Sequence, residues 1–113
     1  DVHNYPDPVA PAAESGLAIV LGEFGGLGLP VQGHTWEQKN WGYQKMSDST
    51  DLLRRYEQFY AIVRDLVTAK GLSASVYTQT TDVETETNGL MTYDRKVDKM
   101  GFENVRKAMH PGQ

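Results

Sequence analysis

The sequence predicts an α/β fold with parallel strands, and three observations support this. A short apolar run stands near the start, an amphipathic helical pattern follows a long loop, and a second apolar segment comes directly after that helix. Strands and helices that alternate in this way are typical of parallel βα units. Two such units do not close a sheet, so the chain is either a small open α/β domain or an arc of a barrel.

The first strand is predicted over residues 17 to 22, after an irregular, proline-rich segment formed by residues 1 to 16. The strand reads LAIVLG, and an uninterrupted apolar run of this kind is typical of a strand covered on both faces. Residues 23 to 47 show no clear period, and they contain both tryptophans and five glycines. A loop this long and this aromatic is predicted to be ordered and functional.

A helix is predicted next, because apolar side chains recur at spacings of three and four between residues 52 and 67. Residues 47 to 50 offer several N-cap side chains, and Gly71 is a natural stop after Lys70. The stripe includes Tyr56, Phe59 and Tyr60, which we assign to packing of the helix against the sheet.

The last part of the chain is predicted to contain a strand over residues 72 to 79, an irregular segment, and a helix over residues 99 to 109. Phe102, Val105 and Met109 would lie on one side of that helix. The pair Asn88-Gly89 allows an alternative, a hairpin that joins residues 83 to 87 to residues 90 to 93.

Composition excludes several classes of function. A net charge of −4 with scattered basic residues argues against nucleic-acid binding. No apolar run approaches the roughly 20 residues of a membrane helix, and the absence of cysteine excludes disulfides and thiolate metal sites. His3 and His34 have no third ligand at suitable spacing, so neither a metal nor another cofactor is expected.

The acid Glu23 stands at the end of the first strand among Gly22, Gly25, Gly26 and Gly28. The glycine spacing matches no phosphate-binding loop, and a glutamate there would repel a phosphate. Two interpretations remain: a solvated or hydrogen-bonded structural acid, or a catalytic carboxylate. The second is favoured by position, because ligand chemistry in α/β folds lies at the carboxyl ends of the strands, and glycines let a ligand approach closely.

A resemblance to a known family rests on an ordered set of segments. These are DVHNYPDP, VLGEFGGLGLPVQGHTW, KNWGY and GLSASVYTQTTDVETETNGLMTYDRKV, which together span most of the chain. The set resembles the C-terminal part of the catalytic barrel of glycoside hydrolase family 2, which includes β-galactosidases. The resemblance implies an arc of a (β/α)8 barrel: residues 1 to 16 after strand six, 17 to 71 with strand seven, and 72 to 113 with strand eight.

The resemblance also implies roles for single residues. Glu23 matches the catalytic nucleophile of a retaining glycosidase, and Tyr5 matches the residue that orients it. The other residues implied or considered for sugar binding are His3, His34, Trp36, Trp41, Gln79 and Asp82. For His34, Trp36 and Trp41 an equal alternative is that they anchor the long loop. The family often carries a tryptophan at the end of strand eight; this sequence does not, which leaves the sugar specificity open.

Further expectations concern what surrounds the chain. The family takes its acid/base from an Asn-Glu pair after strand four, and the sequence contains no Asn-Glu pair. We therefore expect a piece of a longer enzyme, inactive alone, whose partners are a glycoside substrate, the rest of the barrel and upstream β-sandwich domains. The start of the chain has no export signal, while the family suggests a bacterial periplasmic or secreted enzyme. The isolated chain is expected to self-associate. The competing hypothesis is a non-catalytic α/β binding module.

Overall fold

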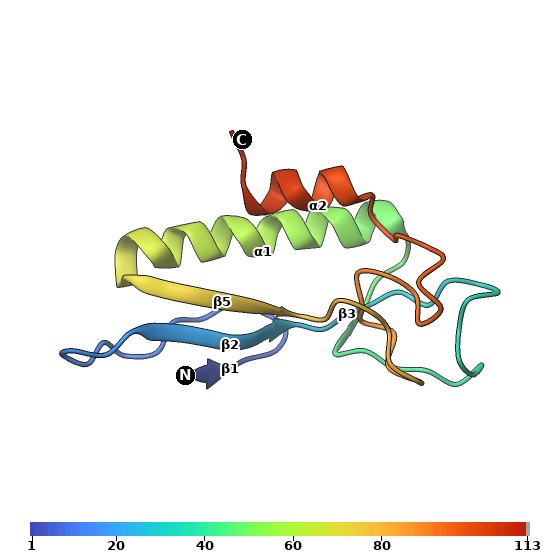
Figure 1. The fold of residues 1–113 in the computed structure, drawn as a ribbon, viewed down its shortest axis with the longest axis horizontal. Coiled ribbons are helices and arrows are strands. Elements are labelled where there is room, and N and C mark those ends of the chain that lie inside the picture. Colours follow the sequence, from blue (N-terminus) through green and yellow to red (C-terminus); the bar gives the residue numbers. More distant parts are fainter. Residues whose placement is uncertain (113) are drawn as a thin grey trace.

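A parallel three-stranded sheet organises the computed structural model, which describes residues 1 to 112. Its strands are β1 (Val2–His3), β2 (Ile19–Gly25) and β5 (Leu72–Thr78), in the order β1-β2-β5. A second small sheet pairs β3 (Leu27–Gly28) with β4 (Gln44–Lys45), also in parallel. The predicted α/β class is thus confirmed (Figure 1).

The long helix α1 (Ser49–Lys70) connects β2 to β5 and covers one face of the sheet (Figure 1). Its first turn is capped by Asp48, whose side chain accepts a hydrogen bond from the Asp51 backbone amide. Its end is capped by Gly71 in the left-handed conformation (φ 72°), which a glycine adopts without steric cost. Both ends agree with the sequence prediction.

The core lies between α1 and the sheet. Phe24 of β2 contacts the rings of Phe59 and Tyr60 from α1 edge-on, at centroid distances of 6.1 and 5.8 Å. Tyr77 of β5 contacts Phe24 from the side, at 5.5 Å. Edge-to-face pairs of this kind add to the free energy gained by burying apolar area. The predicted helix-to-sheet packing of Tyr56, Phe59 and Tyr60 is confirmed, since all three are buried.

The short helix α2 (Phe102–Met109) packs on α1, farther from the sheet (Figure 1). Arg64 of α1 donates a hydrogen bond to the Ala108 carbonyl oxygen at 2.8 Å, which ties the two helices together. The predicted apolar side of this helix is partly wrong: Val105 is buried together with Ala108, whereas Phe102 is 79% exposed and Met109 is exposed as well. A helix of only eight residues presents too short an inner face to cover Phe102 as well.

Two other predictions differ from the structure. The first strand begins at Ile19 and includes Glu23, so Leu17 lies outside it and is exposed. The hairpin at Asn88-Gly89 does not form, because the only antiparallel bridge within residues 83 to 93 joins Val83 to Glu86. Asn88 is fully buried instead, which a hairpin turn would not require.

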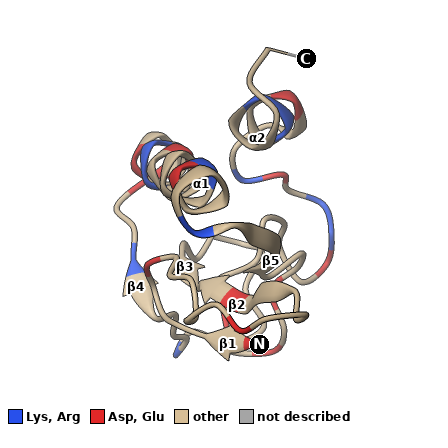
Figure 2. Cartoon of the chain, turned by 90° about the vertical axis from the view of Figure 1, so that its left-hand side faces the viewer, with Lys and Arg blue, Asp and Glu red and all other residues tan. Residues whose placement is uncertain are grey.

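The sheet face away from α1 carries no helix in the described part of the chain (Figure 1). On that sheet Val76 of β5 is 53% exposed. The long loops that follow β2 and β5 gather at the carboxyl ends of the strands (Figure 1). Lysine, arginine, aspartate and glutamate are interspersed along both helices (Figure 2). Over residues 1 to 112, neither helix has the length and apolar character needed to cross a membrane.

Candidate functional site

Glu23 lies near the carboxyl end of the central strand β2, between β1 and β5. Its strand register pairs it with His3 of β1. The Glu23 side chain is 42% exposed, so its carboxylate is open to solvent on one side. The pairing of β2 with β5 is irregular between Leu21 and Phe24, which is where Glu23 stands. Irregular pairing of this kind redirects side chains next to sites of function.

Tyr5 is the closest partner of Glu23. The Tyr5 hydroxyl lies 2.5 Å from Glu23 Oε2 and 3.0 Å from Thr78 Oγ1. Burial and the hydrogen bond to the Glu23 carboxylate raise the pKa of Tyr5 to about 12. The phenol therefore stays protonated at neutral pH and can donate to the carboxylate.

His3 contacts the other oxygen of the same carboxylate. Its Nδ1 lies 3.5 Å from Glu23 Oε1, and its Nε2 lies 3.3 Å from Asp1 Oδ2. His3 and Tyr5, near the start of the chain, thus form one cluster with Glu23 at the strand ends. Tyr5 at one oxygen and His3 beside the other hold the carboxylate in one orientation.

The glycines around Glu23 make room for aromatic rings. A Cβ on Gly25 would lie 2.4 Å from Tyr77, and a Cβ on Gly26 would lie 2.4 Å from Tyr43. Both positions have positive φ, 99° and 68°, which also favours glycine. The space that the sequence suggested for a ligand is therefore filled, at these two glycines, by the protein's own tyrosines.

Tyr43 and Trp41 extend the cluster into the loop after β2. The Tyr43 ring stacks on the Tyr5 ring at a centroid distance of 3.9 Å and an angle of 6°. Trp41 meets Tyr43 edge-on at 5.3 Å and is about half exposed. Of the predicted loop aromatics, Trp41 is thus connected to Glu23 through two tyrosine rings.

Trp36 and His34 lie in a second group, which joins the two long loops. His34 Nδ1 is 2.8 Å from Asp94 Oδ2, and Trp36 meets Tyr93 edge-on at 5.5 Å. The hydrogen bond from Thr92 and the contact with His34 hold the pKa of Asp94 well below its usual range. This arrangement agrees with the loop-anchoring alternative for both residues, although Trp36 remains 56% exposed.

Gln79 and Asp82 hold the loop after β5. Gln79 donates to Asn88 Oδ1 at 2.6 Å. The Asp82 carboxylate is buried, only 4% of the residue being exposed, and Lys99 Nζ lies 2.7 Å from its Oδ1. Desolvation raises the pKa of Asp82 and lowers that of Lys99, and their mutual attraction opposes both shifts. A sugar could meet the Asp82 side chain only if this ion pair opened.

Two members of the cluster were not predicted from the sequence, Thr78 and Tyr43. Thr78 could have been found, because it ends the predicted strand over residues 72 to 79 and so belongs at the same rim as Glu23. Tyr43 could not, since its stacking depends on how a loop of irregular sequence folds back. Within residues 1 to 112, no cluster of three histidine or acidic side chains is placed to hold a metal ion.

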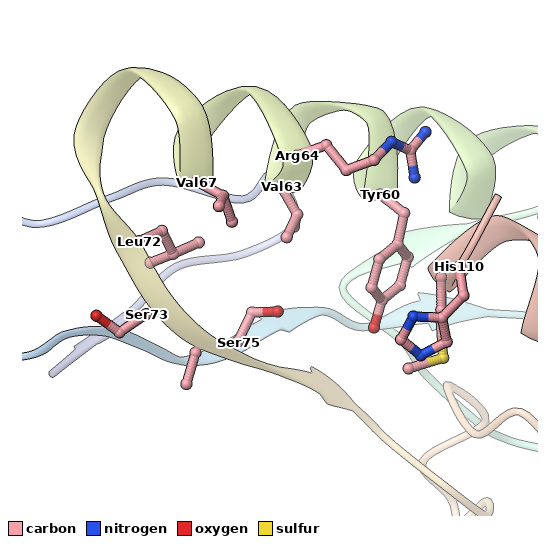
Figure 3. Close-up of a pocket in the computed structure, with 10 residues that line it drawn as sticks. Tyr60, Val63, Arg64, Val67, Leu72, Ser73, Ser75 and His110 are labelled. Atoms are coloured by element: carbon pink, nitrogen blue, oxygen red, sulfur yellow. The ribbon is translucent and has the colours of Figure 1, made fainter. Parts of the chain in front are cut away.

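A separate groove of about 310 Å³ lies at the other end of the sheet, between α1, β5 and the end of α2. Figure 3 shows Tyr60, Val63 and Val67 pointing from α1 toward β5, with His110 at one side. Most of this lining is apolar, and no residue of the cluster around Glu23 belongs to it. The volume of a hollow and the convergence of polar groups therefore single out different places in this molecule.

Comparison with known proteins adds no assignment: no family model matches the chain, and the search of curated proteins found no match.

Proposed function

We propose that the chain is an arc of a (β/α)8 barrel from a retaining glycoside hydrolase that acts on β-linked sugars, with Glu23 as the nucleophile. The observation that carries the proposal is the cluster of Glu23, Tyr5 and His3 at the carboxyl ends of adjacent parallel strands. In this view β1, β2 and β5 correspond to strands six, seven and eight. The resemblance to glycoside hydrolase family 2 supplies the substrate class.

The chemistry requires a carboxylate that stays ionised and attacks the anomeric carbon. The C–O bond to the leaving group breaks, a glycosyl ester forms on the carboxylate, and water later hydrolyses that ester. Donation from Tyr5 to Oε2 holds the carboxylate in one orientation. Aromatic rings at the rim, with Trp41 half exposed, suit the apolar faces of a pyranose.

The second carboxyl group would come from outside the chain. Retaining glycosidases place their two carboxyl groups about 5 to 5.5 Å apart, and the second protonates the leaving oxygen. With no Asn-Glu pair in the sequence, we expect the acid/base on a strand that precedes this segment in the gene. An upstream reading frame with an Asn-Glu pair after a short apolar strand supports the enzyme. A stop codon or an unrelated domain there supports the binding-module alternative.

Turnover of the complete enzyme tests the role of Glu23 directly. We expect Glu23→Gln to lower kcat/KM by at least about ten-thousandfold, because an amide does not form the glycosyl ester. The matched control is Glu57→Gln on the exposed outer side of α1, which should leave kcat/KM within about twofold. Comparable activity of the two variants would remove Glu23 from the mechanism.

The isolated 113-residue chain should be inactive and should associate. Within residues 1 to 112, β1 and β5 each pair on one side only, so two rows of backbone amides and carbonyls lack strand partners. The uncovered sheet face adds the exposed Val76. Sedimentation velocity should show dimers or larger species at micromolar concentration. A monodisperse monomer that binds no hydrophobic dye would favour an independent small domain.

A further inference from the structure

The hydroxyl of Tyr5 has two oxygen partners but only one proton. Glu23 Oε2 lies at 2.5 Å and Thr78 Oγ1 at 3.0 Å. A phenol donates one hydrogen bond and accepts others. The proton goes to the carboxylate, because a hydrogen bond to a charged acceptor is shorter and about twice as strong as one to a neutral hydroxyl. Thr78 is left as the donor to Tyr5.

From this geometry we propose that Thr78 is a positioning residue: its hydroxyl donates to the Tyr5 oxygen and thereby directs the Tyr5 proton to Glu23. The inference rests on the proposed function, since its purpose is to hold a nucleophilic carboxylate. The proton order is Thr78 Oγ1–H to Tyr5 Oη, and Tyr5 Oη–H to Glu23 Oε2. No proton is transferred in the resting chain; the donors only fix one another's direction.

The fold places Thr78 for this role. It is the last residue of β5 and pairs with Gly25 in the register of β2. Its carbonyl oxygen accepts a hydrogen bond from the Gly26 amide at 2.9 Å, which fixes the strand end. The preceding side chain, Tyr77, points under α1 and packs against Tyr56 at 4.9 Å. Successive side chains of a strand alternate between faces, so Thr78 points to the opposite side, where Tyr5 lies.

The stacked ring of Tyr43 supports the same arrangement from the side. A nearly parallel stack at 3.9 Å restricts rotation and tilting of the Tyr5 ring. The Tyr43 backbone amide donates to the Gly26 carbonyl oxygen at 2.9 Å, so the ring that carries out this restriction is itself held to the end of β2. Ring position comes from Tyr43, and hydroxyl direction comes from Thr78.

The titration of Tyr5 distinguishes a donor at Thr78 from a merely structural residue. A donor to the phenol oxygen favours the phenolate, whereas a neighbouring carboxylate opposes it. Removing the Thr78 hydroxyl should therefore raise the pKa of Tyr5, and removing the Glu23 charge should lower it. General loosening of the fold would move the pKa in one direction only, toward that of a solvated tyrosine.

The experiment uses the whole 113-residue chain labelled with 3-fluorotyrosine, whose more acidic phenol brings the titration into a milder pH range. The 19F signal of Tyr5 is assigned by its loss in Tyr5→Phe. In Thr78→Val, which keeps the shape and removes the hydroxyl, the Tyr5 midpoint should rise by about 0.5 to 1 pH unit. Thr78→Ser, which keeps the hydroxyl, should restore the original midpoint, and Glu23→Gln should lower it.

The signals of the buried residues Tyr56 and Tyr60 report in the same spectra whether each variant keeps its fold. An unchanged or lowered midpoint in a folded Thr78→Val variant would overturn the proposal, as would a Thr78→Ser variant that behaves like Thr78→Val. These outcomes do not depend on catalysis. If the midpoints move as expected and the complete enzyme hydrolyses no glycoside, the proposed function fails and the hydrogen-bond order stands.

Discussion

The two ends of the sheet differ in what they offer a ligand. At the carboxyl end, Tyr5 and Glu23 converge from neighbouring strands, and buried polar contacts such as Asp82 with Lys99 support the loops behind them. At the amino end, an open groove of about 310 Å³ has a mainly apolar lining, with Arg64, Ser73, Ser75 and His110 as its polar members. In the groove no carboxylate is among the lining side chains of residues 1 to 112, whereas at the carboxyl end Glu23 is held by Tyr5. The comparison teaches that in this chain the hydrogen-bonded cluster around Glu23 lies at the strand ends, and that cavity volume does not point to it.

The largest effect on stability is expected for the buried ion pair between Asp82 and Lys99, which holds the loop after β5. Lys99→Met leaves the Asp82 carboxylate buried without its cation, and Asp82 Oδ2 already has no hydrogen-bond partner within residues 1 to 112. We expect a loss of about 3 to 5 kcal/mol in the free energy of unfolding, measured by denaturant titration. In the groove, Val67→Ala should cost less than about 1 kcal/mol, because Val67 is half exposed. Equal losses at both ends would contradict the comparison.

A smaller effect is expected from the glycine that makes room for Tyr77. In Gly25→Ala the new Cβ would meet the partly buried Tyr77 ring at 2.4 Å, in addition to the unfavourable φ of 99°. Gly33→Ala is the matched control, since its φ is also positive (82°) but no atom lies within 4 Å of the added Cβ. Thermal unfolding should show a cost of about 1 kcal/mol for Gly33→Ala and about 1 to 3 kcal/mol more for Gly25→Ala. Similar costs would mean that backbone conformation alone selects glycine at residue 25.

The smallest effect concerns how the free energy of unfolding changes at low pH. The pKa of Asp94 is depressed in the folded chain, so Asp94 stabilises the fold above the unfolded-state pKa of about 3.9 and this contribution is lost as the pH falls below that value. Asp94→Asn should therefore flatten the decline of stability below about pH 4, measured by urea titration at several pH values. Asp65→Asn, on an exposed position of α1, should leave the slope unchanged. If Asp94→Asn does not alter the decline, another titratable group causes the loss of stability at low pH.

Much of the fold could be predicted from local sequence, since α1 has a regular apolar stripe and explicit caps at both ends. The strands followed from two apolar runs flanking that helix. The exposure of Phe102 could not be predicted, because it depends on how much of α2 the rest of the chain reaches. Neither the pattern of the sequence nor a three-stranded sheet establishes a barrel, so the barrel stays a proposal.

The candidate site was predictable to a similar degree. Glu23 could be placed at a strand end from the apolar run before it. Tyr5 followed only from the family resemblance, because residues 1 to 16 were predicted to be irregular and the two-residue strand β1 was missed. The inward turn of Asp82 was not predictable, because it depends on Lys99, which stands 17 residues away in an irregular segment. Pairing across loops of this kind carries no periodic signal in the sequence.

Covalent trapping of the nucleophile tests the central claim most directly. A 2-deoxy-2-fluoro glycoside with a good leaving group slows both steps of a retaining glycosidase but slows breakdown of the glycosyl ester more, so the ester accumulates. Peptide mass mapping of the inactivated complete enzyme should then find one added sugar, attached to Glu23 in the segment LAIVLGEFGG. An enzyme that is inactivated with the sugar on a different carboxylate, or one that hydrolyses the reagent with inversion at the anomeric carbon, would contradict the assignment of Glu23 as the nucleophile.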